Sequence, residues 1–398
     1  MSFFKFPKWA LDLINSHMAN CLWDDYEGHS KIHLANWHLV CMKKEYGGLG
    51  VPNLRDLNLC LLGSWIKRFI SDEGKLWHLL IDRKYVKSQN IFALHHSHKS
   101  TFWKGVLWAT QALKFGYRWM VGNGKKVRFW EDTWFGTAPL AVLFWDLYSI
   151  VNEKGKAISE IWVENELRVS FRRTFSTDMW QRWLELVEIS SSIQLNDEMD
   201  SMIWQYEPSG VYSTQSLYVV INFRDVTPVY IPAVWNLNIL PRVQVFIWLL
   251  SNNKLMTKDN LKIRGVEKPP HCMFCEEIET IPHLFFDCIV AKSCWEMTSD
   301  FLGSKIGQDY ESIACKWLSS KKFGATNTIS AIVLWSIWLI RNNFIFRKQS
   351  WKDIRYVWWT ILKISRNWKP LYKESISTKM EQWQTYVEQQ ARAPLRIK

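Results

Sequence analysis

The chain of 398 residues is poor in cysteine and has no long uninterrupted apolar run. Its eight cysteines are too few for a disulfide scaffold. The N-terminal residues lack the apolar segment and the small-residue cleavage site of a signal peptide. The longest apolar run, 331–340, is far shorter than the roughly 20 residues of a membrane span, so it predicts a buried helix. These absences predict an intracellular protein of the nucleus or cytoplasm, not secreted and without a membrane partner.

The composition is that of a globular protein with a strong positive charge. Hydrophobic residues make up 48% of the chain and charged residues 22%, which excludes wholesale disorder and a fibrous repeat. The formal net charge of +12 favours a polyanionic partner. At about 150 residues per domain, the length predicts two or three compact units.

Acidic residues are absent from 83–130, a stretch that carries ten Lys or Arg. Aromatic residues, among them Trp108, Phe115 and Trp119, alternate with these bases. Single-stranded nucleic acids are held by cations along the backbone and by rings on which bases stack, so the stretch predicts a nucleic-acid contact. The alternative is that the rings are core residues and the bases line the solvated surface. The candidate contacts in this first basic block are Lys99, Lys104, Lys114, Arg118, Lys125, Lys126 and Arg128.

A second basic block covers residues 341–398, which carry 13 Lys or Arg against four Asp or Glu. Helical spacing over 351–369 places Trp358, Ile361 and Trp368 on one side and bases on another. A basic amphipathic helix can lie on phosphate, on an anionic membrane or on an acidic partner, and it can also be an ordinary surface helix. The candidate nucleic-acid contacts here are Lys352, Arg355, Lys363 and Arg366.

The pattern along the chain predicts an α+β fold that is mainly helical. Helices are expected over 54–70, over 234–250 with a break at Pro241, and over 257–264, where Thr257 is a capping residue. The remaining elements are two small β-hairpin regions and a zinc-stapled helical module.

Two hairpins are expected from their turn residues. Gly122-Asn123-Gly124 separates the segments 117–120 and 126–130 and predicts a tight turn between paired strands. A Pro208-Ser209-Gly210 turn predicts a second hairpin within 204–219.

The strongest local motif is Cys272-x2-Cys275-x7-His283-x4-Cys288. A structural Zn²⁺ site takes four thiolate or imidazole ligands in a tetrahedron, and a Cys-x2-Cys pair supplies two thiolates from one tight turn. His283 and Cys288 are five residues apart, about 140° on an ideal α-helix, so one of them must lie at a helix start. The alternative is that buried thiols and a surface His share this spacing by accident. His271 and Cys294 are possible substitute ligands.

Motifs for catalysis are otherwise missing. The Asp24-Asp25 pair follows Leu22-Trp23, whereas a polymerase palm needs an aromatic-x-Asp-Asp hairpin and a distant Asp to hold two Mg²⁺. The sequence contains no Gly-rich Lys-Ser/Thr loop, no Gly-x-Ser-x-Gly and no His-Glu-x-x-His. We therefore expect that the chain is not an enzyme.

An ordered series of motifs resembles the C-terminal portion of plant LINE-type (non-LTR) retrotransposon reverse transcriptases, including their zinc-binding domain. The series covers most of residues 20–300. It consists of Lys31-Ile32-His33, Gly47-Gly48-Leu49-Gly50, Gly122-Asn123-Gly124, Arg128-Phe129-Trp130, Asp132-Thr133-Trp134, Ser209-Gly210-Val211-Tyr212-Ser213, Asn260-Leu261, Arg264-Gly265 and the cluster of Cys272, Cys275, His283 and Cys288.

The resemblance implies four regions and a function. The expected regions are a post-polymerase, thumb-like helical region at 1–120, a hairpin-containing linker region at 121–205, the reverse transcriptase zinc-binding domain at 206–298 and a basic helical tail at 299–398. The chain is expected to begin after the catalytic palm and to bind Zn²⁺ and nucleic acid, RNA or DNA, without sequence preference. The alternatives are a zinc-stapled protein-interaction module and a residual polymerase or nuclease.

Overall fold

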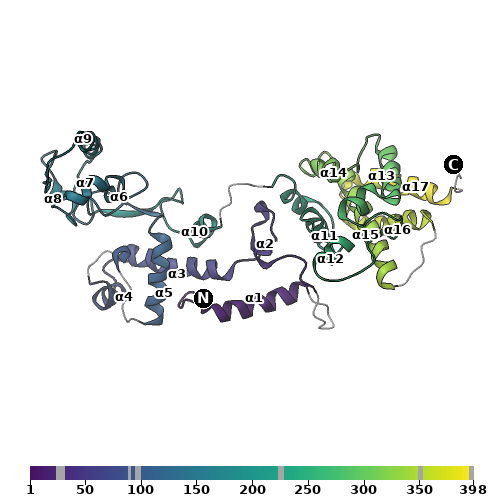
Figure 1. Cartoon of the computed structure of the whole chain (residues 1–398), viewed down its shortest axis with the longest axis horizontal. Helices are drawn as coiled ribbons and strands as arrows, with labels where there is room; N and C mark the ends of the chain where they lie inside the picture. Colours follow the sequence, from purple (N-terminus) through teal and green to yellow (C-terminus); the bar gives the residue numbers. More distant parts are fainter. Residues whose placement is uncertain (24–31, 88–90, 95–99, 223–227, 348–352, 394–398) are drawn as a thin grey trace. The chain divides into compact units, whose positions relative to one another are not determined.

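The computed structural model describes residues 1–23, 32–87, 91–94, 100–222, 228–347 and 353–393 (Figure 1). The described chain forms two compact units. Unit 1 comprises 1–15 and 53–223, and unit 2 comprises 16–52 and 224–398. The Asp24-Asp25 pair and the candidate contacts Lys99 and Lys352 lie outside the described residues. The fold is mainly helical with two small sheets, as the sequence predicts.

Unit 1 contains two buried apolar clusters, one around Trp103 and Trp204 and one around Phe129 and Trp130. Its elements are α3 (Leu54–Ser71), α4 (Leu76–Ile81), η2 (Asp82–Val86), η3 (Ile91–Ala93), α5 (Thr101–Leu113), β1 (Tyr117–Met120), α6 (Leu140–Leu143), α7 (Trp145–Ile150), α8 (Ile158–Ile161), β2 (Trp162–Val163), β3 (Glu166–Leu167), α9 (Thr177–Ser191), β4 (Ser201–Trp204) and α10 (Thr214–Ile221).

Unit 2 packs around one long helix, α15 (Gly324–Arg347), whose residues Ile329 to Ile340 are largely buried. Helix α1 (Lys8–Trp23) crosses from unit 1 into unit 2. The other elements of unit 2 are α2 (Trp37–Cys41), η1 (Lys44–Tyr46), η4 (Pro232–Asn236), α11 (Pro241–Ser251), α12 (Lys258–Ile263), η5 (His283–Asp287), α13 (Ile289–Leu302), α14 (Tyr310–Trp317), α15 (Gly324–Arg347), α16 (Arg355–Asn367), η6 (Lys369–Leu371) and α17 (Glu374–Arg392).

Several predicted helices are confirmed, although the Thr257 side chain makes no capping hydrogen bond. The Asn53 side chain accepts hydrogen bonds from two backbone N–H groups at the start of α3. Pro241 occupies the first turn of α11, and α12 runs between Thr257 and Arg264. Of the described helices, α15 is the one whose length and apolar composition would suffice to cross a membrane. Its burial at the centre of unit 2 accounts for that composition, as predicted for 331–340.

The predicted hairpin at Gly122-Asn123-Gly124 is wrong. Strand β1 pairs antiparallel with β4, in the register Tyr117 with Trp204, and β2 pairs with β3. The Gly-Asn-Gly segment instead wraps the buried carboxylate of Asp200, which accepts hydrogen bonds of 2.8 Å from the backbone N–H groups of Gly122, Gly124 and Lys126. A carboxylate can satisfy several converging donors, which fixes the loop without a strand-to-strand turn.

The second predicted hairpin is replaced by a strand and a helix. The Trp204 N–H donates to the carbonyl of Gly210 at 2.8 Å, which closes the turn. The chain then enters α10, because Ser213 caps that helix through a hydrogen bond from the N–H of Ser216.

The two units divide the chain differently from the four expected regions. The segment 16–52, expected within the region 1–120, belongs to unit 2, where the Trp248 Nε1–H donates to the carbonyl of Gly47 at 2.7 Å. The expected boundary between residues 298 and 299 falls inside α13. The zinc region and the basic tail share one core because α15 packs against elements of both.

Candidate metal centre and basic residues

Cys272, Cys275, His283 and Cys288 converge in unit 2, as their spacing predicts. Their ligand atoms all lie within 4.8 Å of one another. The Sγ of Cys288 lies 3.9 Å from that of Cys272 and 4.0 Å from that of Cys275, and the Nε2 of His283 lies 3.1 Å from the Cys275 Sγ. Two sulfurs on one tetrahedral zinc with bonds of about 2.3 Å are about 3.8 Å apart. The four side chains therefore fit a tetrahedral Zn²⁺.

The first two ligands are held by a short chain reversal. His271 and Ile278 form an antiparallel bridge, and the Cys272 N–H donates to the carbonyl of Glu277 at 2.6 Å. The sulfurs of Cys272 and Cys275 accept hydrogen bonds from the backbone N–H groups two residues further on. Such outer hydrogen bonds orient thiolate ligands and compensate part of their charge.

The third and fourth ligands are brought together by a π-turn. Helix η5 begins at His283, and the Cys288 N–H donates to the His283 carbonyl at 2.7 Å. This hydrogen bond spans five residues, and the wider turn places the two side chains on one side of the backbone. Cys288 is also the N-cap residue of α13, so the expected helix start is confirmed at this ligand.

Hydrogen bonds from the neighbouring thiol and from the start of α13 lower the pKa of the Cys288 thiol. The largest cause is a hydrogen bond donated by the Cys272 thiol, and the backbone N–H groups of Val290 and Ala291 add to it. The same Cys272–Cys288 hydrogen bond, together with burial, raises the pKa of Cys272, and burial raises that of Cys275. A divalent ion at the centre would remove all three protons, because a coordinating thiol is deprotonated.

The two substitute ligands are not part of the cluster. The Nδ1 of His271 lies 2.7 Å from the carbonyl oxygen of Glu276, on the exposed side of the chain reversal. Cys294 is fully buried on α13, and its burial raises the pKa of its thiol. The candidate site therefore has three cysteines and one histidine, which leaves no open position on a tetrahedral ion.

A buried ion pair that the sequence analysis missed supports the ligand segment. Glu279 lies between Cys275 and His283, and its Oε1 is 2.6 Å from the Arg341 guanidinium on α15; both side chains are at most 1% exposed. Glu279 also accepts a hydrogen bond of 3.0 Å from the backbone N–H of Lys258 at the start of α12. Through Glu279, the segment that carries the metal ligands is therefore linked to helices α12 and α15. No local sequence signal connects positions 62 residues apart.

Comparison with known proteins identifies the region around these ligands. Residues 212–295 match the protein family described as zinc-binding in reverse transcriptase. The match contains all four ligands and begins at Tyr212, near the end of unit 1. The four ligands therefore lie within a stretch that is similar to reverse transcriptase zinc-binding domains.

One curated relative extends the similarity beyond that domain. The chain is 23% identical over 378 residues to a protein of Arabidopsis thaliana named as a putative ribonuclease H protein. The alignment covers 87% of this chain and 58% of the relative, so the chain spans little more than half of that protein's length. No solved structure matches the chain.

The first basic block is gathered around two neighbouring hollows of unit 1. Lys125, Lys126 and Arg128 line a cavity of about 850 Å³ together with three acidic residues, Glu73, Asp82 and Asp200. Lys114 and Arg118 line a much smaller one beside Glu131 and Asp132, and Trp119 and Met202 line both. The Lys126 ammonium pairs with Glu73 at 2.7 Å, whereas Lys104 is exposed on α5.

Most rings of this block belong to the core. Trp103, Phe129 and Trp130 are at most 2% exposed, and Phe115 is 75% exposed. Among the described rings of the block, Phe115 is thus the one that offers a largely free face for stacking. The interpretation of the rings as core residues is correct for the buried ones.

The segment 353–369 of the second basic block contains the amphipathic helix α16. Its apolar side, with Trp358, Ile361 and Trp368, is buried, as the spacing predicts. Arg355 pairs with Asp353 at 2.8 Å, and Arg366 pairs with Glu388 of α17 at 2.6 Å. Lys363 is exposed and forms no ion pair with a described residue. The two arginines are therefore partly neutralised within the protein.

Proposed function

We propose that this chain is a nucleic-acid-binding, C-terminal portion of a plant LINE-type, non-LTR reverse transcriptase, in which zinc fastens the fold. The observation that carries the proposal is the closed three-cysteine, one-histidine cluster inside the match to a reverse transcriptase zinc-binding domain. The ordered motifs from Lys31 to Cys288 support the assignment to LINE-type elements.

The metal in this proposal is a structural Zn²⁺. Cys272, Cys275, Cys288 and the Nε2 of His283 would hold it, and the ion would link the chain reversal at 271–278 to the N-terminus of α13. Four protein ligands leave no position for a reactive water, so the site supports folding and not hydrolysis. We infer that the chain has no polymerase or nuclease chemistry of its own, which primer extension with Mg²⁺ or Mn²⁺ would test.

The nucleic-acid contact in this proposal is electrostatic. The candidate phosphate contacts are the bases of the two hollows: Lys125, Lys126 and Arg128 beside Glu73, Asp82 and Asp200, and Lys114 and Arg118 beside Glu131 and Asp132. Such a surface follows a phosphate backbone without reading sequence. Binding should therefore be similar for unrelated single-stranded sequences.

The deciding experiment is a salt-titrated binding curve on the full, zinc-loaded chain. Labelled single-stranded RNA and DNA of equal length are titrated by fluorescence anisotropy from low salt upwards. We expect the logarithm of the affinity to fall linearly with the logarithm of the salt concentration, by roughly 0.7 per phosphate contact. Absence of binding at low salt, or affinity that does not depend on salt, would refute the proposal.

A second candidate function is a zinc-stapled protein-interaction module. An apolar hollow of about 380 Å³ on unit 1 is lined by Phe3, Trp65, Trp77, Leu80 and neighbouring residues, and Phe3 and Leu80 are more than half exposed. Exposed apolar surface of this kind favours contact with another protein. Association that survives nuclease treatment and is lost in Leu80→Glu would favour this function over nucleic-acid binding.

A further inference from the structure

A buried acidic residue lies in the stretch that joins the first pair of metal ligands to the second. Glu279 follows Cys275 and precedes His283, and its side chain is completely buried. Its partner Arg341 on α15 is 1% exposed. Neither side chain belongs to the cluster of ligand atoms. The pair therefore needs an explanation other than direct metal coordination.

Stability alone does not explain why this pair is buried. Removing two charges from water is costly, and apolar side chains of the same volume often give an equally stable or more stable core. What a carboxylate offers beyond apolar packing is the capacity to accept hydrogen bonds from several directions at once. The contacts of Glu279 show which parts of the chain it brings together.

Every polar group of Glu279 has a partner. Its Oε1 accepts hydrogen bonds from the Arg341 Nη2 at 2.6 Å and from the backbone N–H of Lys258 at 3.0 Å, and its Oε2 accepts one from the Arg341 Nε at 3.4 Å. Its backbone N–H donates to the carbonyl of Pro270 at 2.9 Å, and its carbonyl accepts from the N–H of Asp259 at 3.4 Å. One residue thus connects α12, α15 and the start of the chain reversal that carries the first two cysteines.

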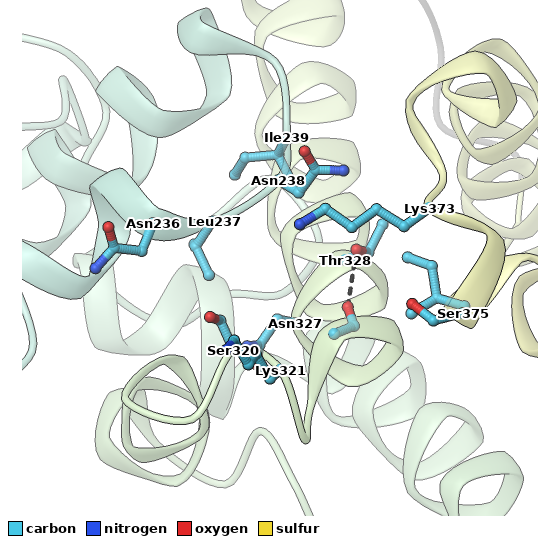
Figure 2. Close-up of a pocket in the computed structure, with 12 residues that line it drawn as sticks. Asn236, Leu237, Asn238, Ile239, Ser320, Lys321, Asn327, Thr328, Lys373 and Ser375 are labelled. Atoms are coloured by element: carbon cyan, nitrogen blue, oxygen red, sulfur yellow. Dashed lines mark hydrogen bonds between the residues drawn. The ribbon is translucent and has the colours of Figure 1, made fainter.

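Helix α15 provides a fixed base for the guanidinium. At the start of the helix, the Thr328 hydroxyl donates to the carbonyl four residues earlier at 2.9 Å (Figure 2). Figure 2 shows Asn327 and Thr328 in a small polar pocket that the segment 236–239 and the start of α17 also line. Further along α15, the Arg341 guanidinium lies 5.1 Å from the centre of the Trp338 ring. The guanidinium is therefore held by its own helix, and the carboxylate is positioned against it.

The residue after Glu279 starts the helical turn that carries the histidine ligand. The Thr280 Oγ1 accepts a hydrogen bond of 3.2 Å from the backbone N–H of His283, and the Thr280 carbonyl accepts one of 2.9 Å from the N–H of Leu284. A threonine in this arrangement fixes the first turn of a helix. Because Thr280 is joined directly to Glu279, the place at which this turn begins depends on the buried ion pair.

We propose that Glu279 and Arg341 are positioning residues of the metal centre. The pair holds the segment before η5 so that the Nε2 of His283 faces the sulfurs, 3.1 Å from the Cys275 Sγ. Loss of residues that orient metal ligands typically weakens metal binding by roughly 10- to 100-fold. This inference rests on the zinc centre of the proposed function and does not depend on nucleic-acid binding.

The first test compares zinc affinities of full-length chains. Glu279→Gln/Arg341→Met leaves no unpaired charge buried but separates the ligand segment from α15. The control Val387→Ala removes two methyl groups from a fully buried side chain of α17, a helix that carries no metal ligand, and so lowers stability by another route.

We expect the dissociation constant for zinc to rise roughly 10- to 100-fold in the double variant and to change far less in the control. Competition with a chelating dye measures the affinity, at a temperature at which circular dichroism shows each protein to be folded. Wild-type affinity in the double variant, or an equal loss in the control, would overturn the inference.

The second test identifies which ligand is affected, with Co²⁺ in place of Zn²⁺. Charge-transfer absorption reports the thiolate ligands, whereas d–d absorption is strong only for a tetrahedral ion. We expect the double variant to keep the thiolate bands and to lose d–d intensity, because His283 is held less firmly. An unchanged ratio of the two bands would refute the role assigned to the pair. A wild-type chain that takes up neither metal would refute the zinc centre of the proposed function itself.

Thr280→Val tests the connection to His283 and leaves the ion pair intact. Valine has nearly the shape of threonine but no acceptor for the His283 N–H, so the loss of one hydrogen bond predicts roughly three- to tenfold weaker zinc binding. Wild-type affinity in this variant would overturn the inference. If Glu279→Gln/Arg341→Met does not fold, Thr280→Val decides.

Discussion

The amide N–H of Cys288 donates a hydrogen bond of 2.7 Å to the carbonyl of His283, five residues earlier. In an α-helix these two residues would point about 140° apart, and one of them could not reach a shared ion. The wider π-turn allows both side chains to reach one ion. His283 lies at the start of this turn, and Cys288, at its end, is the N-cap residue of α13. The metal centre thus depends on backbone geometry as much as on ligand identity.

Removal of one metal ligand should empty the centre and destabilise unit 2. Cys275→Ser deletes the thiolate that lies closest to His283, and we expect bound zinc to fall from one equivalent per chain to well below one. Structural zinc supplies roughly 10–16 kcal/mol of apparent binding free energy in small domains, so the melting temperature should fall markedly.

The matched control for the zinc variant is Cys315→Ser, at an exposed cysteine outside the cluster. This variant should retain one equivalent of zinc and the wild-type melting curve. Zinc is measured by elemental analysis and unfolding by circular dichroism. A Cys275→Ser protein that keeps both its zinc and its stability would show that the centre is misassigned.

The buried pair of Glu279 and Arg341 should be costly to break. Glu279→Gln leaves the guanidinium buried without a counter-charge, and we expect a loss of about 3–5 kcal/mol in the free energy of unfolding, measured in urea. The double variant Glu279→Gln/Arg341→Met should recover part of this loss, because it no longer buries an unpaired charge. A single variant as stable as the wild type would contradict this.

Asp200 should determine the conformation of the 122–126 loop. Asp200→Asn keeps the size of the side chain but places an NH₂ group against converging backbone donors, so we expect a loss of roughly 2 kcal/mol. Amide hydrogen exchange at Gly122, Gly124 and Lys126 should accelerate. The control Asp197→Asn, at an exposed residue three positions earlier, should change neither stability nor exchange.

Alanine substitutions at two glycines after α13 should separate the cost of backbone strain from the cost of a steric clash. Gly303 and Gly307 have φ values of +65° and +78°, and a Cβ at Gly303 meets nothing within 4 Å. Gly303→Ala should therefore cost about 1–2 kcal/mol of unfolding free energy. A Cβ at Gly307 would lie 1.9 Å from the Trp295 ring, so Gly307→Ala should cost roughly 2–5 kcal/mol.

The difference between the glycine variants is the informative quantity. Trp295 is buried, and its Nε1–H is bound to the carbonyl of Phe285 at 2.7 Å, so the ring cannot move aside cheaply. Thermal and urea unfolding measure both costs. Equal losses for the two variants would mean that Trp295 repacks freely.

The basic cavity of unit 1 should contribute to nucleic-acid affinity. Lys125→Gln/Arg128→Gln removes two cations that line the cavity, and we expect weaker binding with a salt dependence reduced by roughly 1.4 logarithmic units per decade. Arg172→Gln/Arg173→Gln removes the same charge from exposed positions of unit 1 outside the basic block. If both variants bind alike, the cavity is not the contact surface.

The sequence by itself was sufficient to predict the metal ligands and several helices, because these features depend on residues that lie close together in the chain. The Cys-x2-Cys pair and the later His and Cys identify the ligand set because each pair lies within a few residues. Thr257 and Pro241 mark the starts of α12 and α11, because the residues that favour a helix N-terminus act within its first turn. The two basic blocks can also be recognised from the sequence alone, since the number of charged residues in a segment does not depend on the fold.

The tertiary structure alone decided which distant segments meet. Strand β1 pairs with β4 and not with the segment 126–130 that follows it. The reason is that the Asp200 carboxylate accepts hydrogen bonds from the backbone N–H groups of the intervening loop. The Glu279–Arg341 pair joins two positions that are 62 residues apart. Such contacts depend on how buried surfaces and polar groups are satisfied across the whole unit, and no short sequence pattern carries that information.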